Sequence, residues 1–161
     1  VIIIHRRKAV SLKDVLNPEC VEINIEGDDK YDVIKSMVTR LSQVHNISHK
    51  VLRDIINDVI AREKLMSTGM QYGIAIPHCS SQYIDNLMAF IAISKHGVNF
   101  DSTDGSLAKI IVLLVVPKAR LNDHVRTMAS IARLLNQKEM REAILFADKE
   151  SKIIEIFSGI E

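Results

Sequence analysis

The sequence is poor in the residues that stabilise secreted proteins or bind nucleic acids. Its 161 residues include two cysteines, Cys20 and Cys79, which form neither a CxxC pair nor a disulfide framework. Reduced thiols in a cytoplasmic protein are therefore expected. Aromatic residues make up 4% of the chain, and 21 basic against 20 acidic residues give a formal net charge of +1. So few stacking surfaces and so little excess charge argue against nucleic-acid binding.

The sequence also has no apolar run long enough for a membrane helix, which needs about 20 such residues. The chain does begin with Val1-Ile-Ile-Ile4, followed by the basic stretch His5-Arg6-Arg7-Lys8. A membrane helix that ends before cytoplasmic basic residues has this pattern, but four apolar residues favour a processed or tag-derived start. We therefore expect an N-terminal extension or the edge of a cloned segment over residues 1–10. One domain over residues 11–161, with no direct membrane insertion, is expected to follow.

Apolar periodicity along the chain alternates between strands and helices. The segment 21–25 alternates as a half-buried strand, and the apolar runs 87–93 and 110–116 are short and branched enough to be buried strands. Apolar residues at helical spacing follow Asp29 and Ser48, which are good helix N-caps. The pattern predicts a single α/β domain, and it does not give the strand order.

The second half of the chain continues this alternation. Turn-rich residues at 95–97 and 101–105 are expected to separate the strands. After Pro117 we expect Asn122 or Asp123 to cap a helix, and two further helices over 138–146 and 149–157.

The most informative segment runs from Ser67 to Cys79, where a short apolar run ends in a proline followed at once by a histidine. Ile74-Ala75-Ile76 is expected to form a strand, and Pro77 has no N–H with which to continue the ladder. His78 is therefore expected at a rigid strand end. An imidazole has an ordinary pKa of about 6.5, so it can serve as nucleophile, base or metal ligand near neutral pH. Position alone does not choose among these roles.

The context of this histidine resembles that of type-2 enzyme IIA domains of the bacterial phosphoenolpyruvate-dependent phosphotransferase system, the fructose, mannitol and nitrogen-regulatory group. The family's histidine signature is similar to Glu63, Met70 and Ile74-Ala75-Ile76-Pro77-His78-Cys79. The stretch 61–69 resembles the arginine-glutamate and Ser-Thr-Gly segment that precedes the active histidine. His124, in the stretch 122–125, matches the family's second active-site histidine. The likeness runs from about Ser11 to the C-terminus.

The resemblance implies a central mixed β-sheet flanked by helices and a phosphoryl carrier that needs no metal or cofactor. In the family, the histidine matching His78 accepts phosphate from a histidine-containing phosphocarrier protein and passes it to a IIB domain or a regulatory target. Two positions depart from the commonest pattern. Gln71 stands where glycine is usual, so the loop is expected to sit differently, and Cys79 stands where glycine is commonest, although cysteine fits.

Phosphoryl transfer also needs positive charge or N–H donors for the oxygens of the moving group, and residues near His78 can supply them. Arg62 offers a planar fork for phosphate oxygens. His124, in the first turn of its helix, is expected to donate a hydrogen bond near the positive end of the helix dipole. Ser67 or Thr68 is expected to add a hydroxyl group, and Glu63 either orients Arg62 or faces water.

Several alternatives remain open on the sequence alone. His45 and His49 are spaced for a metal on one helix face, but Ser48 is expected to break the helix between them, and no third ligand is evident. These observations argue against the function of a metal hydrolase. A IIA-like regulatory interaction module, controlling a transporter or transcription regulator, is an alternative function, because phosphorylation of His78 would switch partner binding. Cys79 is expected to be inert and Met66 to fill the core. An apolar docking patch is expected around His78.

Overall fold

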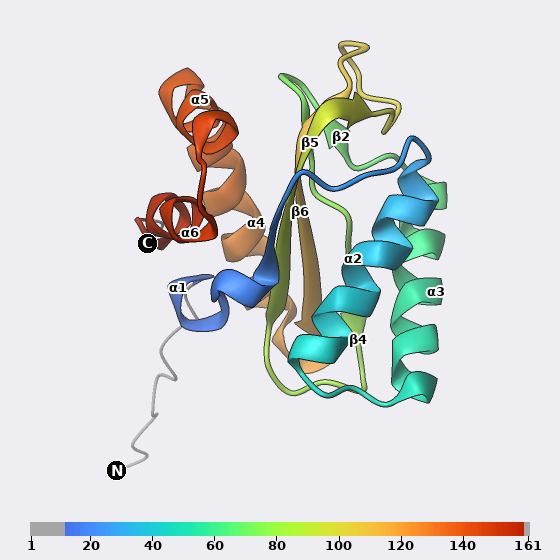
Figure 1. The fold of residues 1–161 in the computed structure, drawn as a ribbon. Coiled ribbons are helices and arrows are strands. Elements are labelled where there is room, and N and C mark those ends of the chain that lie inside the picture. The colour runs from blue at the N-terminus through green and yellow to red at the C-terminus, as the bar shows by residue number, and fades with distance from the viewer. Residues whose placement is uncertain (1–11, 160–161) are drawn as a thin grey trace.

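A mixed six-stranded sheet lies between two layers of helices (Figure 1). The computed structural model describes residues 12–159, so the expected extension over residues 1–10 lies outside the described residues. One face of the sheet is covered by α2 (Lys30–Val44) and α3 (His49–Leu65). The other face carries α1 (Leu12–Val15), α4 (Leu121–Leu135), α5 (Lys138–Phe146) and α6 (Glu150–Ser158). The α/β fold class expected from the sequence is confirmed.

Two long antiparallel strands form the middle of the sheet. They are β5 (Met88–Val98) and β6 (Ala108–Pro117), and the side chains of both are almost entirely buried because helices cover both faces. The order is β1-β5-β6-β3-β2, and β4 also pairs with β6. The remaining strands are short: β1 (Val21–Ile23), β2 (Gly69–Met70), β3 (Ile74–Ala75) and β4 (His78–Ser81).

Strands β3 and β4 are two halves of one path along β6, interrupted at Pro77. Ile74 lies opposite Ile110 and His78 lies opposite Leu114, both in parallel pairing. The expectation that Pro77 ends the ladder is therefore wrong. Proline lacks only the donor, and its carbonyl still accepts the N–H of Leu114 at 3.0 Å. His78 consequently begins a second paired stretch instead of standing at a strand end.

The helix starts match the sequence in two cases and differ in a third. The side chain of Asp29 accepts the N–H groups of Tyr31 and Asp32, and that of Ser48 accepts the N–H of Val51, so both expected N-caps are confirmed. Helix α4, by contrast, begins at Leu121, ahead of Asn122 and Asp123, and no side chain caps it. The chain enters α4 directly from a 3₁₀ turn, η2 (Lys118–Arg120), which leaves the expected capping residues inside the helix.

The residues 95–97 also behave differently from the expected turn. Strand β5 continues through them, with a shift in its register against β6 between Ile93 and Val98. Gly97 has a positive φ of 81°, and a Cβ there would lie 2.5 Å from the Cβ of Leu107. The turn-forming residues therefore make a bulge within one strand. A short 3₁₀ turn, η1 (Pro18–Cys20), precedes β1.

Candidate active site

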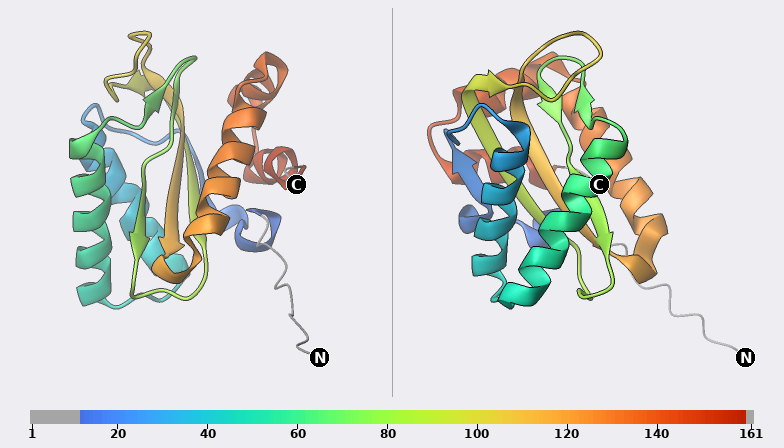
Figure 2. Two further views of the ribbon diagram at one scale, coloured as in Figure 1. Left: turned by 180° about the vertical axis from the view of Figure 1, so that it is seen from behind. Right: turned by 90° about the vertical axis from the view of Figure 1, so that its right-hand side faces the viewer.

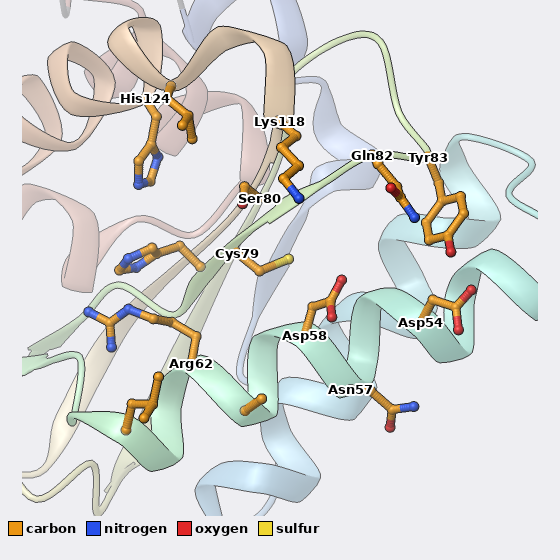
Figure 3. A pocket seen from close by; sticks show the side chains of 14 residues that line it. Asp54, Asn57, Asp58, Arg62, Cys79, Ser80, Gln82, Tyr83, Lys118 and His124 are labelled. Atoms are coloured by element: carbon orange, nitrogen blue, oxygen red, sulfur yellow. The ribbon is translucent and has the colours of Figure 1, made fainter.

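An open cavity of about 760 Å³ lies where α3, β4 and the start of α4 meet. Strand β4 lies between α3 and α4 in both views of Figure 2. Arg62 enters the cavity from α3, His78 from β4 and His124 from α4. The structure thus brings together three residues that the sequence analysis selected from positions far apart in the chain. Figure 3 shows Arg62 and His124 at one end of the cavity and Asp54 and Tyr83 at the other.

The ring of His78 is held in one tautomer by the backbone. Its Nδ1 lies 2.7 Å from the carbonyl oxygen of Ile76. A carbonyl only accepts hydrogen bonds, so Nδ1 carries the proton and Nε2 carries a free lone pair. His78 is half-buried, which leaves its ring accessible from the cavity. This arrangement presents Nε2 as the nucleophilic atom.

Burial is the main cause that lowers the pKa of His78 below its ordinary value. The hydrogen bond to Ile76 opposes this shift, the charge of Arg62 adds to it, and the charge of Glu63 opposes it. The net lowering keeps the imidazole neutral at neutral pH. A neutral ring is the form that can attack an electrophile.

The ring of His124 faces that of His78, with ring centroids 5.1 Å apart and planes tilted by 44°. Burial, then the charges of His78 and Arg62, lower the pKa of His124, so it is also neutral near pH 7. Its Nδ1 is buried and has no hydrogen-bond partner among residues 12–159. An unpaired buried nitrogen costs about 1–3 kcal/mol whether it is a donor or an acceptor, so Nε2 is the ring nitrogen left to bond a ligand. When Nε2 carries the proton, His124 offers a donor there.

Arg62 supplies the positive charge at this end of the cavity. One guanidinium nitrogen donates a 2.8 Å hydrogen bond to the carbonyl oxygen of Met66, which anchors the side chain across the last turn of α3. The remaining donors of the fork are left for a ligand. Together with the His124 donor, this charge suits the oxygens of a phosphoryl group bound to His78.

The three other residues expected near His78 point elsewhere. Glu63 is buried and bonds to Lys30 and Thr68, so the expectation that it orients Arg62 or faces water is wrong. The hydroxyl of Thr68 donates to Glu63, and that of Ser67 donates to the carbonyl of Phe100. None of the three lines the cavity. The internal contacts use up their polar groups, which sequence matching alone does not reveal.

The cavity also contains residues that the sequence analysis missed. Lys118 follows the end of β6 and lies near Asp58, while Asp54 and Tyr83 line the far end. A signal for Lys118 was present, because Pro117-Lys118 follows a buried strand in the same way as Pro77-His78. Burial and the charge of Asp54 raise the pKa of Asp58 above its ordinary value, and the charge of Lys118 opposes this shift.

The part of the chain that the structure describes places neither a reactive thiol nor a group of metal ligands at this site. Burial raises the pKa of Cys79 to about 12, which keeps the sulfur protonated beside His78. His45 and His49 are separated by the break before α3, as expected. Within residues 12–159, no three His, Cys, Asp or Glu side chains are grouped so that they could hold a metal ion.

Comparison with known proteins identifies the family. The family model described as "Phosphoenolpyruvate-dependent sugar phosphotransferase system, EIIA 2" matches residues 14–159. The chain belongs to this family. It is a IIA component of the phosphotransferase system, a phosphoryl carrier that acts through a phosphohistidine. The resemblance noted in the sequence is confirmed.

Two curated relatives illustrate the range of this family. The fructose-specific EIIABC component of Bacillus subtilis is 29% identical over 149 residues, which is 92% of this chain and 23% of that protein. The IIA domain thus spans under a quarter of that relative's length. The nitrogen regulatory protein of Pseudomonas aeruginosa is 26% identical over 152 residues, 94% of this chain and 97% of that protein.

Solved structures share the fold. The nitrogen regulatory protein IIA-Ntr of Neisseria meningitidis has a TM-score of 0.83 at 24% identity, covering 91% of this chain and 98% of that one. The Escherichia coli mannitol enzyme IIA, in complex with phosphorylated enzyme IIB, has a TM-score of 0.75 at 16% identity, covering 89% and 97%. No helix within residues 12–159 of this IIA domain is long and apolar enough to cross a membrane.

Proposed function

We propose that His78 is the phosphoryl acceptor of this IIA domain, and that it takes the group on Nε2 from the histidine-containing phosphocarrier protein. The recipient is a IIB domain or a regulated protein, and the reaction takes place in the cytoplasm. The observation that carries the proposal is the 2.7 Å contact between His78 Nδ1 and the Ile76 carbonyl, which leaves Nε2 unprotonated. Its supports are the Arg62 charge and the His124 donor at the same end of the cavity.

The transfer is balanced without a metal or an external base. The lone pair of His78 Nε2 attacks the phosphorus in line, and the bond from phosphorus to the donor's histidine nitrogen breaks, with that nitrogen keeping the electron pair. The His78 Nδ1 proton stays on the ring and on its bond to Ile76, where it stabilises the charge that develops on the imidazole. Arg62 and the Nε2–H of His124 hold the phosphoryl oxygens.

Four exposed apolar side chains support the proposal that the partner at this site is a protein. Two of them line the cavity, and the other two are chain neighbours of cavity residues. Together they form what we call the apolar rim: Leu65 (84% exposed), Met66 (69%), Leu121 (52%) and Val125 (67%). Side chains of this kind around a polar centre suit a transient protein interface that excludes water. Met66, which was expected in the core, is one of them. The mannitol IIA relative, solved with phosphorylated IIB, is consistent with a IIB partner here.

The direct test is a phosphorylation assay with phosphoenolpyruvate, enzyme I and the phosphocarrier protein. Intact mass should show one acid-labile phosphoryl group on the wild type and on His96→Ala, a matched change at an exposed histidine on β5. His78→Ala should show none. His124→Ala should still accept phosphate but pass it on more slowly. A phosphoryl group on the His78→Ala variant would overturn the assignment, and complete loss with His124→Ala would overturn the division of roles.

A regulatory output is the second candidate, and the nitrogen regulatory relative of nearly equal length favours it. In this role phosphate on His78 changes the binding of a target protein, through added negative charge, and is not passed on. Chasing labelled protein with IIB domains separates the two. Rapid loss of label to a IIB cysteine or histidine indicates sugar transport, and label that stays on His78 with every IIB domain tested indicates regulation.

A further inference from the structure

A buried ion pair joins α2 to α3, the helix that contributes Arg62 to the cavity, and neither partner lines the cavity itself. The carboxylate of Glu63, with a fully buried side chain, lies 3.1 Å from Lys30 Nζ. Burial alone would lower the pKa of Lys30, but hydrogen bonds to Asp101 and Glu63 outweigh this and raise it, so the lysine stays charged. A buried charged pair is costly to desolvate and is weak evidence for stability. Its place in the fold indicates another role.

The carboxylate of Glu63 also holds the backbone of Thr68. Its two oxygens accept the N–H of Thr68 at 3.2 and 3.1 Å, and one of them accepts the Thr68 hydroxyl at 2.5 Å. Thr68 immediately precedes β2, which pairs with β3 on the approach to His78. Glu63 therefore fixes the residue from which the β2–β3 segment starts.

Two further hydrogen bonds continue from Thr68 to the imidazole. The carbonyl of Thr68 accepts the N–H of Ile76 at 3.2 Å. The carbonyl of the same Ile76 then accepts Nδ1–H of His78 at 2.7 Å. An unbroken series of contacts thus links α2, through Lys30 and Glu63, to the ring that takes the phosphoryl group.

We propose that Glu63 is a positioning residue for His78, whose carboxylate fixes Thr68 and, through Thr68 and Ile76, sets the tautomer and orientation of the imidazole. Nε2 remains unprotonated only while the Ile76 carbonyl points at Nδ1 of His78. The hydrogen bond from the N–H of Ile76 to the carbonyl of Thr68 holds Ile76 in that orientation. The kinetic part of this inference rests on the proposed function, whereas the tautomer is a property of the unphosphorylated protein.

The decisive variant replaces both charges, as Glu63→Leu combined with Lys30→Met. Apolar residues of similar volume leave no unpaired buried charge, so the domain is expected to fold. Two controls accompany it. Asp101→Asn removes the exposed partner of Lys30 and keeps Glu63 on Thr68. Ile153→Val removes a methylene from the buried face of α6, outside the cavity, and reproduces a general loss of stability.

The readouts are the ¹⁵N shifts of the His78 ring at pH 8 and the rate of phosphoryl acceptance. In the double variant we expect the Nδ1–H tautomer to give way to a mixture with Nε2–H, and acceptance to slow about 10- to 100-fold, as small displacements of reacting groups do. Both controls should keep the wild-type tautomer and rate. Since Glu63 raises the pKa of His78, its removal should also lower that pKa.

Three outcomes overturn the inference. A folded double variant that keeps a pure Nδ1–H tautomer shows that Glu63 does not position the ring, whatever the rate. A changed tautomer with a wild-type rate shows that the positioning is irrelevant to transfer. The same tautomer change in Ile153→Val shows a general loosening of the fold. A wild-type protein that takes no phosphate would defeat the proposed function, and the ¹⁵N shifts would still decide the role of Glu63.

Discussion

At the scale of single residues, the site depends on keeping two neighbouring imidazoles neutral. Burial lowers the pKa of both His78 and His124, and the charge of Arg62 adds to each shift. The Ile76 carbonyl then selects the tautomer of His78. In the proposed transfer, His78 consequently provides a lone pair and His124 provides a donor.

The first prediction concerns pH. Acceptance requires neutral His78, so its rate should stay level down to the ordinary histidine pKa of about 6.5 and fall only below it. Arg62→Gln removes a charge that lowers this pKa, so the acid limb should move to higher pH, and the plateau rate should drop because the phosphate fork is lost. An NMR titration of His78 beside a pH–rate profile measures both. Arg126→Gln, an exposed change on α4 outside the cavity, should alter neither.

The same titration has a consequence for stability. Because the folded-state pKa of His78 is lowered, the unfolded chain binds more protons just below pH 6.5, and the free energy of unfolding should fall as the pH drops through that range. His78→Gln should flatten this dependence in urea unfolding at pH 5.5 to 7.5. An unchanged slope in that variant would show that His78 titrates alike in both states.

A second prediction at this scale concerns Cys79. With its pKa raised to about 12 by burial, the thiol should not react with iodoacetamide at pH 8 in the folded domain. The buried Cys20, whose pKa burial also raises, should behave alike. Both should be alkylated in guanidinium, which mass spectrometry will show. Rapid alkylation of Cys79 in the native protein would contradict the account and would make the thiol a candidate participant.

At the scale of elements, the site exists because proline interrupts a strand without ending its pairing. Pro77 costs the ladder a donor but not an acceptor, so β4 resumes on β6 and carries His78 into the gap between α3 and α4. The helices are placed by local signals of unequal strength. Asp29 and Ser48 cap α2 and α3 with their side chains, and α4 starts from a 3₁₀ turn.

This difference between helix starts gives the third prediction. Asp29→Ala removes a side chain that accepts hydrogen bonds at 2.8 and 3.0 Å, and it should lower the free energy of unfolding by about 1 kcal/mol. Asn122→Ala should change the free energy of unfolding by less than about 0.5 kcal/mol, because no side chain caps α4, although the sequence favours a cap at this position. Urea unfolding of both variants measures the contrast, and equal losses would contradict the assigned cap.

The elements also show which parts of the site the sequence predicts. Apolar periodicity and caps locate most helices and strands, and the family signature selects His78, His124 and Arg62, which the fold brings together. Contacts between residues far apart in the chain leave no comparable signal in the sequence. Lys30, the buried partner of Glu63, is 33 residues away in the chain. Met66 was expected in the core because methionine is apolar, yet the helix ends there and exposes it.

At the scale of the whole molecule, the two helical layers place α3 and α4 on either side of β4 (Figure 2), and residues of both helices line the cavity there. The buried β5 and β6 pair forms a rigid base, and the cavity opens at the junction of the layers. The proposed acceptor His78 and the apolar rim are therefore parts of one surface. This explains how a half-buried histidine can be both shielded and accessible to a protein partner.

The fourth prediction tests that surface. Leu65→Ser combined with Val125→Ser should slow phosphoryl acceptance from the phosphocarrier protein about tenfold or more by weakening docking, with little change in stability because both side chains are exposed. Phe146→Ser is the matched control, since Phe146 is 86% exposed on α5, which contributes no residue to the cavity. Equal effects of the two changes on the second-order rate constant would show that the rim does not dock the donor.

The central claim is that Nε2 of His78 carries the phosphoryl group, and it is tested most directly by NMR of the phosphorylated domain labelled with ¹⁵N-histidine. The account predicts one phosphohistidine, with phosphorus coupled to Nε2 of His78 and the Nδ1 proton retained on its bond to Ile76. Phosphorus coupled to Nδ1 of His78, or to either nitrogen of His124, would contradict it.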